Sequence, residues 1–429
     1  PPRRESGSDS MAVDYIESKG KSELEKPQWT VIKGRVVDLS TFRHPGGNII
    51  KYFQGIDGTS AFESFHRHSK KAQLMLKSLP EVEEVVDVPE QKPEHVVVMT
   101  QLLAKWKADG LFEPRLAVST AYGATVFGAI VAAVALAPYV PISAGLLMGT
   151  AWAHCGFLQH MGGHRELGAI SLVWQHFFEG LCKGGSASWW RGRHNKHHAK
   201  TNVIGEDGDL RTTPFFAWDE QLAKKVPDWS LRTQAFTFLP ALGAYVFIFF
   251  FTVRKYAVVK KLWHEVVLMA AHYIIFAWGL SKAGCGLSDG LTMYTVAYAF
   301  QGIYLGFFFG LSHFAVERVP ASATWLESTM IGTIDWAGSS AFAGYVSGFL
   351  NVQIEHHMAP QMPMENLRQI RGDCKRVAAE MQLPYREMSF VAAVKLMMLG
   401  LYNTGCKELA LRKSYRAAAG AVLDKLHAD

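Results

Sequence analysis

Residues 160–164 read His160-Met-Gly-Gly-His164, and this histidine cluster is the first of three along the chain. The others are His194-Asn-Lys-His197-His198 and Gln353-Ile-Glu-His356-His357, so seven of the 17 histidines lie in three short stretches. Histidine is the commonest metal ligand, through a neutral imidazole nitrogen. Residues four apart on a helix share one face, with roughly 6 Å between their Cβ atoms. Packing alone does not account for three such clusters, and we predict a metal site with more than one ion.

The overall composition is that of a membrane protein. Hydrophobic residues make up 49% of the 429 residues, charged residues only 19% and aromatic residues 12%, a balance that favours membrane-spanning helices. The net charge of +6 suits a face apposed to anionic lipid, and the chain has no concentrated basic stripe of the kind that binds nucleic acid. Five widely spaced cysteines suggest neither a disulfide framework nor a zinc site. Without a signal-peptide pattern, we expect the internal apolar segments to direct membrane insertion.

Four regions are expected in order along the chain. Residues 1–27 are polar and predicted to be disordered. A small ordered domain follows at 28–90, and its β-branched stretch around Gly34 predicts a short strand pair. Residues 91–115 are expected to form a linker and an amphipathic stretch. Residues 116–429 carry the long apolar segments and the histidine clusters, and they are the predicted membrane domain.

The first ordered region, from Trp29 to about Pro80, resembles a cytochrome b5 domain. It contains the family's signature His-Pro-Gly-Gly at residues 44–47, and the stretch 57–62, Asp-Gly-Thr-Ser-Ala-Phe, is similar to a second family pattern. The resemblance implies a haem b whose iron is held by two histidines. With two protein ligands the iron has no open position, so such a haem transfers electrons and does not bind oxygen.

The two haem ligands are assigned by matching this pattern. His44 is the first ligand. His66 is the second, because fused members of the family carry a Phe-His pair, here Phe65-His66. His68 is the alternative, because its separation from His44 is closer to that in free cytochrome b5.

Four apolar segments are expected to cross the membrane as two hairpins, since a spanning helix needs about 20 residues. They are residues 116–137, 141 to about 158, 262–281 and 291–311. The segments 169–185 and 239–251 are expected to be interfacial or re-entrant, the second because Arg254, Lys255, Lys260 and Lys261 follow it. The bias of positive residues towards the cytosol places the short turns at 138–141 and 282–290 in the lumen. The histidine clusters, His313 and both termini are then expected on the cytosolic side.

Basic residues surround the second cluster, in the stretch Trp189-Trp190-Arg191-Gly-Arg193 and at Lys196 and Lys200. Paired tryptophans beside positive charges are typical of a membrane interface. These cations are expected either to contact lipid headgroups or to form a seat for an anionic substrate headgroup.

The patterns HxxxH, HxxHH and QxxHH, in this order around paired hairpins, resemble the membrane fatty-acyl desaturases. Gln353 in the third cluster and the fused N-terminal domain resemble the front-end subgroup of that family. The resemblance implies an α+β cytochrome b5-like domain followed by an all-α integral membrane domain with about four transmembrane helices plus interfacial helices. It also implies two non-haem iron ions. The implied iron ligands are His160, His164, His194, His197, His198, His356 and His357, with His313 as the eighth.

The same resemblance implies an oxygen-dependent front-end desaturase of the delta-5, delta-6, delta-8 or delta-4 type. Such an enzyme places a double bond between an existing one and the carboxyl end of a polyunsaturated acyl chain, carried on CoA or on a phospholipid. An unactivated methylene has no acidic proton, so a redox cofactor must carry the chemistry. Electrons are expected to come from NADH–cytochrome b5 reductase through the fused haem. The implied location is the endoplasmic reticulum membrane.

Several polar residues outside the implied ligand set need a role. Asp207, Asp209 and Glu355 are candidates to orient ligand imidazoles by hydrogen bonding. His154 is expected in the core or in support of the ligands, and His176, His264 and His272 are expected to be packed or interfacial. The family usually has an acidic residue directly after the first histidine of the first cluster, where this chain has Met161. That difference puts the local orientation of the ligands in doubt.

Three other functions share most of these sequence features. A cytochrome b5-fused sphingolipid long-chain-base desaturase and an acyl hydroxylase would use the same metal and electron donor. A non-enzymatic alternative is a membrane-anchored electron carrier whose histidines bind metal structurally.

Overall fold

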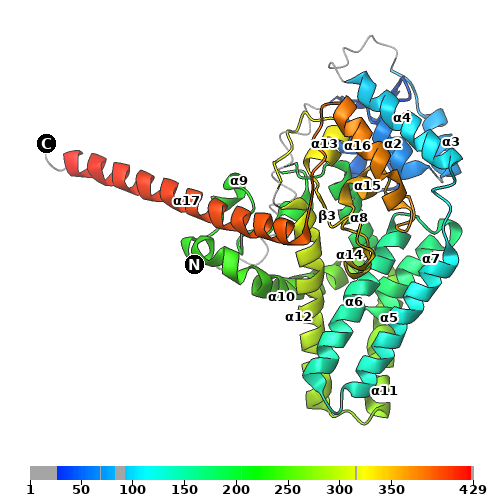
Figure 1. Cartoon of the computed structure of the whole chain (residues 1–429), viewed down its shortest axis with the longest axis vertical. Coiled ribbons are helices and arrows are strands. Elements are labelled where there is room, and N and C mark those ends of the chain that lie inside the picture. The colour runs from blue at the N-terminus through cyan, green and yellow to red at the C-terminus, as the bar shows by residue number, and fades with distance from the viewer. Residues whose placement is uncertain (1–26, 68, 83–91, 204, 315, 427–429) are drawn as a thin grey trace, which may run out of the picture.

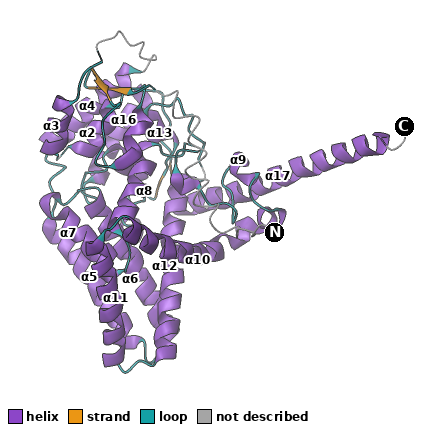
Figure 2. Ribbon diagram, turned by 180° about the vertical axis from the view of Figure 1, so that it is seen from behind, coloured by secondary structure: helices purple, strands orange, loops and turns teal. Residues whose placement is uncertain are grey.

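The computed structural model of the chain describes residues 27–67, 69–82, 92–203, 205–314 and 316–426. The predicted disorder falls almost wholly outside these ranges, and His68 is also outside them. Helices dominate the described residues, and the few strands are short (Figure 2). The predicted fold class is confirmed: a small N-terminal domain precedes a helical membrane domain.

The N-terminal domain combines one strand pair with short helices. Strands β1 (Trp29–Ile32) and β2 (Arg35–Asp38) pair antiparallel, which confirms the predicted strand pair. Both turn residues between them, Lys33 and Gly34, have positive φ, as a tight two-residue hairpin requires. The 3₁₀ segment η2 (Gly47–Phe53) and the helices α2 (Thr59–His66) and α3 (Lys70–Ser78) complete the domain.

Helix α4 (Pro93–Ala108) connects the N-terminal domain to a bundle of four long helices. The bundle consists of α5 (Leu116–Leu136), α6 (Pro141–Gly163), α11 (Trp263–Lys282) and α12 (Leu287–His313). These four helices run side by side, and both hairpin turns lie at the end of the bundle away from the N-terminal domain (Figure 1). Between α6 and α11 the chain forms η3 (Gly168–Ile170), α7 (Ser171–His176), the π-helix η4 (Phe177–Cys182), α8 (Ala187–Ala199), η5 (Gly208–Leu210), α9 (Glu220–Ala223) and α10 (Asp228–Val259).

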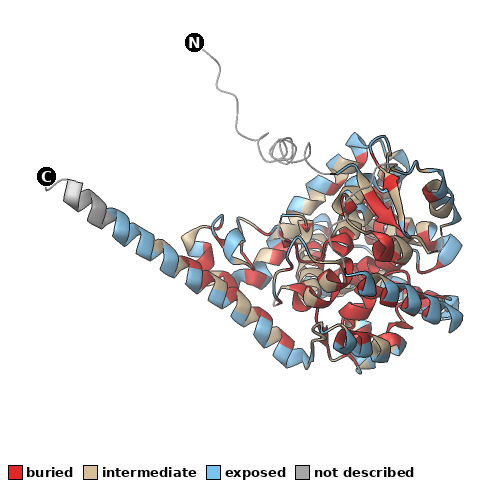
Figure 3. Cartoon of the chain, turned by 90° about the horizontal axis from the view of Figure 1, so that it is seen from above, coloured by how far each residue is buried: buried red, intermediate tan, exposed pale blue. Residues whose placement is uncertain are grey.

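After α12 the chain returns over the end of the bundle that carries the histidines. This part consists of α13 (Trp325–Ile331), β3 (Asp335–Trp336), α14 (Ala341–Ser347), α15 (Gln353–Met358), η6 (Leu367–Ile370), α16 (Arg371–Glu380), β4 (Glu387–Met388) and α17 (Phe390–Leu426). Strands β3 and β4 pair in parallel. Helix α17 projects away from the body, and buried residues concentrate in the body itself (Figure 3).

Within the described residues, four helices are long and apolar enough to cross a membrane, but one of them was not expected. They are α5, α10, α11 and α12. The expected second span, 141–158, lies in α6, whose polar side chains His154, Gln159 and His160 and several glycines lower its hydropathy. The expected interfacial segment 239–251 lies inside α10, a single helix of 32 residues. In both ribbon views α6 runs with the bundle while α10 crosses it (Figures 1 and 2).

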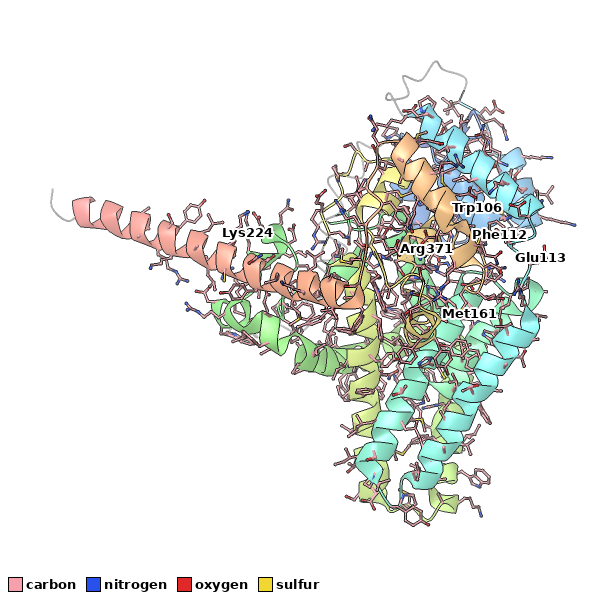
Figure 4. The ribbon with its side chains drawn as sticks, in the orientation of Figure 1. Trp106, Phe112, Glu113, Met161, Lys224 and Arg371 are labelled. Carbon is pink, nitrogen blue, oxygen red and sulfur yellow. The ribbon has the colours of Figure 1, made fainter. Side chains whose placement is uncertain are left out.

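The two domains share one apolar core. Phe53 and Ala61 of the N-terminal domain belong to the same buried cluster as Trp106 and Met358. The Arg67 guanidinium lies 3.8 Å from the Phe112 ring centroid and donates a hydrogen bond to the Leu103 carbonyl at 2.9 Å. Trp106 and Phe112 lie beside the N-terminal domain (Figure 4). The N-terminal domain is therefore packed against the end of the bundle that carries the histidines.

Helices α6 and α12 approach closely through glycines. A Cβ at Gly145 would lie 2.8 Å from the carbonyl oxygen of Met293, and one at Gly149 would lie 2.7 Å from that of Ala297. This spacing, Gly145-x-x-x-Gly149, is a small-residue pattern that lets helix backbones meet in a membrane. The close approach fixes the ends of both helices, His160 and His313, relative to each other.

We predict that Gly149→Val lowers the thermal unfolding temperature of the detergent-solubilised protein. The added side chain would collide with α12, and overpacking of this kind costs about 1–3 kcal/mol. The matched control is Gly128→Val on α5, where an added Cβ meets nothing within 4 Å. Equal unfolding temperatures for the two variants, measured by intrinsic fluorescence, would show that the α6–α12 contact is not tight.

Candidate metal centre

Four helices bring the clustered histidines together. His160 and His164 lie at the C-terminal end of α6, the HxxHH cluster lies on α8, His313 is the last residue of α12 and the QxxHH cluster lies on α15. All eight imidazoles are at most 4% exposed. The three predicted clusters and His313 therefore meet in one buried place.

Five of the eight histidines form the first group. Their candidate ligand nitrogens all lie within 4.8 Å of one another, and the members are His160, His164, His194, His198 and His356. Nε2 of His198 lies 3.0 Å from Nε2 of His194 and 3.1 Å from Nε2 of His356. Among the described residues, Nε2 of His160 and of His164 has no hydrogen-bond partner. Buried nitrogens that converge without protein partners fit a shared cation.

The other three, His197, His313 and His357, form the second group. Each is held through Nδ1: His197 by the Asp207 carboxylate at 2.8 Å, His313 by the Gly332 carbonyl at 3.0 Å and His357 by the Thr201 hydroxyl at 3.0 Å. A hydrogen bond at Nδ1 fixes the ring and leaves Nε2 free for a metal. Nε2 of His197 and of His313 lie 3.3 Å apart. The group is oriented as a three-nitrogen ligand set.

Gln353 adds an amide to the second group. Its Nε2 lies 3.0 Å from Nε2 of His313, and its Oε1 has no hydrogen-bond partner among the described residues. Amide nitrogen and oxygen are assigned from the hydrogen-bond network, and a bound cation would favour the flipped amide with the oxygen inward. The side chain is thus within reach of the same ion as His313.

The electrostatics favour neutral imidazoles at four of the clustered histidines and act in the opposite direction at His197. Burial is the main cause that lowers the pKa of His194, His198, His356 and His357, and neighbouring imidazoles lower it further. Burial also acts to lower the pKa of His197, but the charge and hydrogen bond of Asp207 outweigh it and raise that pKa. Neutral imidazole is the form that binds metal, and all-nitrogen sets suit iron, zinc or copper.

Of the three carboxylates that were expected to orient ligand imidazoles, only Asp207 forms a hydrogen bond to one in the described residues. Asp207 orients His197 as predicted, whereas Asp209 lies 4.0 Å from that Nδ1 and pairs with Arg193. Glu355 does not orient an imidazole: its carboxylate accepts from the Tyr385 hydroxyl at 2.8 Å, and Tyr385 also bonds Asp335. The cause is that Glu355 lies on the opposite side of α15 from the histidines.

The remaining histidines and Met161 lie outside both groups. His154 Nδ1 lies 2.6 Å from the Tyr122 hydroxyl, so it is a core residue. His176 and His264 lie beside the buried Glu265 in a third potential ligand group, and His272 Nδ1 bonds the Leu181 carbonyl. The Met161 side chain belongs to the apolar core (Figure 4). The usual acidic residue is thus replaced here by a packing residue.

A cavity of about 250 Å³ begins at the metal groups and extends between α6, α8, α10 and α12. Its walls include His160, His194, His197 and His313, and beyond them mainly apolar side chains such as Leu242, Phe249 and Leu305. The sequence did not predict this space. Gly302 and Gly306 on α12 line the cavity. Two glycines in an apolar helix do not by themselves predict a cavity, because its other wall comes from α10.

A second cavity, of about 460 Å³, contains the predicted haem ligands. The ring centroids of His44 and His66 lie 5.8 Å apart across it. His66 Nδ1 lies 3.1 Å from the Phe62 carbonyl, which leaves its Nε2 free. Burial, and secondarily His66, lower the pKa of His44 to about 4, so its imidazole is neutral at physiological pH. The pair fits a haem iron held from two sides, and the choice between His66 and His68 stays a prediction.

Comparison with known proteins agrees with this geometry. The family described as fatty acid desaturase matches residues 136–389, and the family described as cytochrome b5-like heme/steroid binding domain matches residues 17–86. An acyl-lipid (8-3)-desaturase of Rebecca salina is 30% identical over 407 residues, which cover 91% of this chain and 93% of that protein. An acyl-lipid (8-3)-desaturase from a Thraustochytrium species is also 30% identical, over 89% of this chain and 93% of that protein. The delta(5) fatty acid desaturase fat-4 of Caenorhabditis elegans is 25% identical, over 80% of this chain and 87% of that protein.

We predict that Asp207→Asn weakens metal binding at the second group. The amide would keep the size of the side chain but lose the negative charge that orients His197, and changes of this kind typically cost about 10–100-fold in metal affinity. Non-haem metal retained during titration with a chelator measures the effect. Asp109→Asn, at the exposed residue directly after α4, is the control. Unchanged retention in Asp207→Asn would mean that His197 is not a ligand.

Proposed function

The chain belongs to the fatty acid desaturase family and carries a cytochrome b5-like domain at its N-terminus, and from this premise we propose that it is a front-end acyl desaturase. It inserts a double bond between an existing double bond and the carboxyl end of a polyunsaturated acyl chain. Relatives named acyl-lipid (8-3)-desaturase, acyl-lipid 8-desaturase and delta(5) fatty acid desaturase support this class. We place the haem domain near residues 28–90 and the membrane desaturase domain at 116–429.

The observation that carries the proposal is the meeting of buried histidines with an apolar cavity. The two histidine groups are consistent with a di-iron centre, and the cytochrome b5-like domain implies haem. We assign His160, His164, His194, His198 and His356 to one iron and His197, His313 and His357 to the other. We assign His44 and His66 to the haem iron. Gln353 is a supporting group near His313.

The iron pair would supply oxygen-dependent removal of two hydrogens from neighbouring methylenes, while O2 and two external electrons and protons become two waters. The chain's own residues provide the setting for this reaction. Leu242, Phe249 and Leu305 form an apolar wall that binds the acyl chain and excludes water. Asp207, Thr201 and the Gly332 carbonyl hold three imidazoles in fixed orientations.

The electron supply is covalently attached to the site that uses it. The haem domain packs against the same end of the bundle as the histidine groups. Because the electron donor is tethered, it needs no diffusional encounter with the desaturase domain, and its effective concentration there is on the order of millimolar. We propose NADH–cytochrome b5 reductase as the partner that reduces the haem. The acyl chain is carried on CoA or on a phospholipid.

The proposed function is tested by expression in yeast fed single polyunsaturated acids, with chromatography of the fatty-acid methyl esters. We expect a new double bond on the carboxyl side of an existing one, and its loss in His356→Ala, which removes a ligand. The exposed His264→Ala is the control and should retain activity. A hydroxylated product, or a product formed only on sphingoid bases, would replace the proposal by an acyl hydroxylase or a long-chain-base desaturase.

We further propose that the protein lies in the endoplasmic reticulum membrane with the histidine groups and both termini in the cytosol. The two turns at the far end of the bundle, at 138–141 and 282–290, are then lumenal. Helix α10 crosses the bundle near its histidine end, so it remains interfacial despite its hydropathy.

Glycosylation-site tags test this orientation. We expect modification of tags in the 138–141 and 282–290 turns, and none at Gly205, at the Lys260–Lys261 turn or at the C-terminus. A glycosylated tag at Lys260–Lys261 would mean that α10 spans the membrane and that the bundle of four is incomplete.

A further inference from the structure

The haem cavity has walls from both domains. The N-terminal domain supplies an almost wholly apolar surface around His44 and His66, including Leu39, Phe42 and Phe62. The membrane domain closes the same cavity with Gly163, His164, Arg165, Arg191, Asn195 and Gln361. The cavity is thus amphipathic: its apolar part comes from one domain, and its polar part comes mainly from the other.

Two arginines dominate that polar part. Arg165 lies in the turn after α6 with φ of +68°, a conformation that is uncommon for a residue with a side chain. Arg191 lies on α8, and its Nη1 donates to the Gln175 amide oxygen at 2.9 Å. Arg165 and Arg191 line the same cavity, so two positive charges lie on its polar side.

Neither guanidinium forms an ion pair within the part of the chain that the structure describes. Bringing two like charges together beside a cavity is unfavourable unless an anion sits between or beside them. Arginine is also the residue best suited to bind carboxylates through paired hydrogen bonds. The arrangement calls for an anionic ligand with its apolar body on the other side of the cavity.

Haem has that distribution of polarity, because its macrocycle is apolar and its two carboxylates project from one edge. We propose that Arg165 and Arg191 bind the two haem carboxylates, so that the membrane domain completes the haem site. The inference rests on the haem assignment proposed above. Among the described residues of the N-terminal domain, Lys71, which is exposed, is the one lysine or arginine that lines this cavity.

Helix α8 gives this binding mode a consequence for electron transfer. Arg191 and Asn195 border the haem cavity. Arg193 and His194 border the apolar cavity beside the metal groups, which we call the acyl cavity. His164, a member of the five-histidine group, borders the haem cavity as well. Haem held by Arg165 and Arg191 would therefore be bound beside the helix that carries the second histidine cluster.

The proposal is tested on the full-length holoprotein with Arg165→Gln, Arg191→Gln and the double variant. Transfer of haem to excess apomyoglobin should be faster by about tenfold or more in the double variant, the equivalent of a lost charge-assisted hydrogen bond. The haem midpoint potential should become more negative, because positive charge near the haem favours the ferrous form. Arg232→Gln, an exposed position on α10, is the control for loss of one cation.

A second arm identifies the anion without relying on substitutions alone. Apoprotein made under haem limitation is reconstituted with haem or with haem dimethyl ester, which lacks the two charges. In the wild type the ester should dissociate about as fast as natural haem leaves the double variant. In the double variant esterification should change the dissociation rate little, because the partners of the carboxylates are already gone.

Three results would overturn the proposal. Equal retention of haem and its ester by the wild type would show that the carboxylates are not bound, and this result needs no variant to fold. Unchanged haem dissociation and potential in the double variant would show the same. A raised KM for the acyl substrate with unchanged haem behaviour would assign the arginines to an anionic substrate headgroup instead. Arg165→Lys with Arg191→Lys, which keeps the charges, should restore part of the retention if the Gln variants misfold.

Discussion

Eight buried imidazoles within two touching groups are the constraint on which the rest of this structure depends. Imidazole nitrogens face one another at 3.0 Å between His194 and His198 and at 3.3 Å between His197 and His313. These nitrogens are buried away from water. Unpaired buried polar atoms cost free energy that a bound cation recovers. The glycine contacts between α6 and α12 and the Nδ1 partners of the second group all serve to hold these rings in place before a metal binds.

Helix α8 divides the functional parts of the molecule. Its histidines contribute to both metal groups, Trp189, Trp190 and Arg193 line the cavity beside those groups, and Arg191 and Asn195 line the haem cavity. Substrate and electron donor can therefore reach the same centre from different sides without sharing a path. The docking of the N-terminal domain through Phe53, Ala61 and Arg67 makes this arrangement part of the fold itself.

Much of the site could be predicted because it depends on local spacing. Spacing predicts that the clustered histidines share helix faces, and the resemblance to the desaturase family implies the seven of them and His313 as ligands. The division into groups of five and three could not be predicted, because it depends on how α6, α8, α12 and α15 cross. The same holds for Glu355, which spacing suggested as a partner of the histidines but which packs towards Tyr385 and Asp335. The apolar pattern predicted a span at 141–158 within α6, although polar residues such as His154 and His160 lower the mean hydropathy of the whole helix. The pairing of Arg165 with Arg191 at the haem cavity requires contacts between domains that no local pattern carries.

Diffraction from crystals of the iron-loaded protein, recorded above and below the iron absorption edge, tests the central claim most directly. The account predicts two non-haem anomalous peaks: one among His160, His164, His194, His198 and His356, and one among His197, His313 and His357. The haem iron should give a third peak between His44 and His66. A single non-haem peak, or a peak between His176, His264 and Glu265 in place of either, would contradict the two-iron assignment.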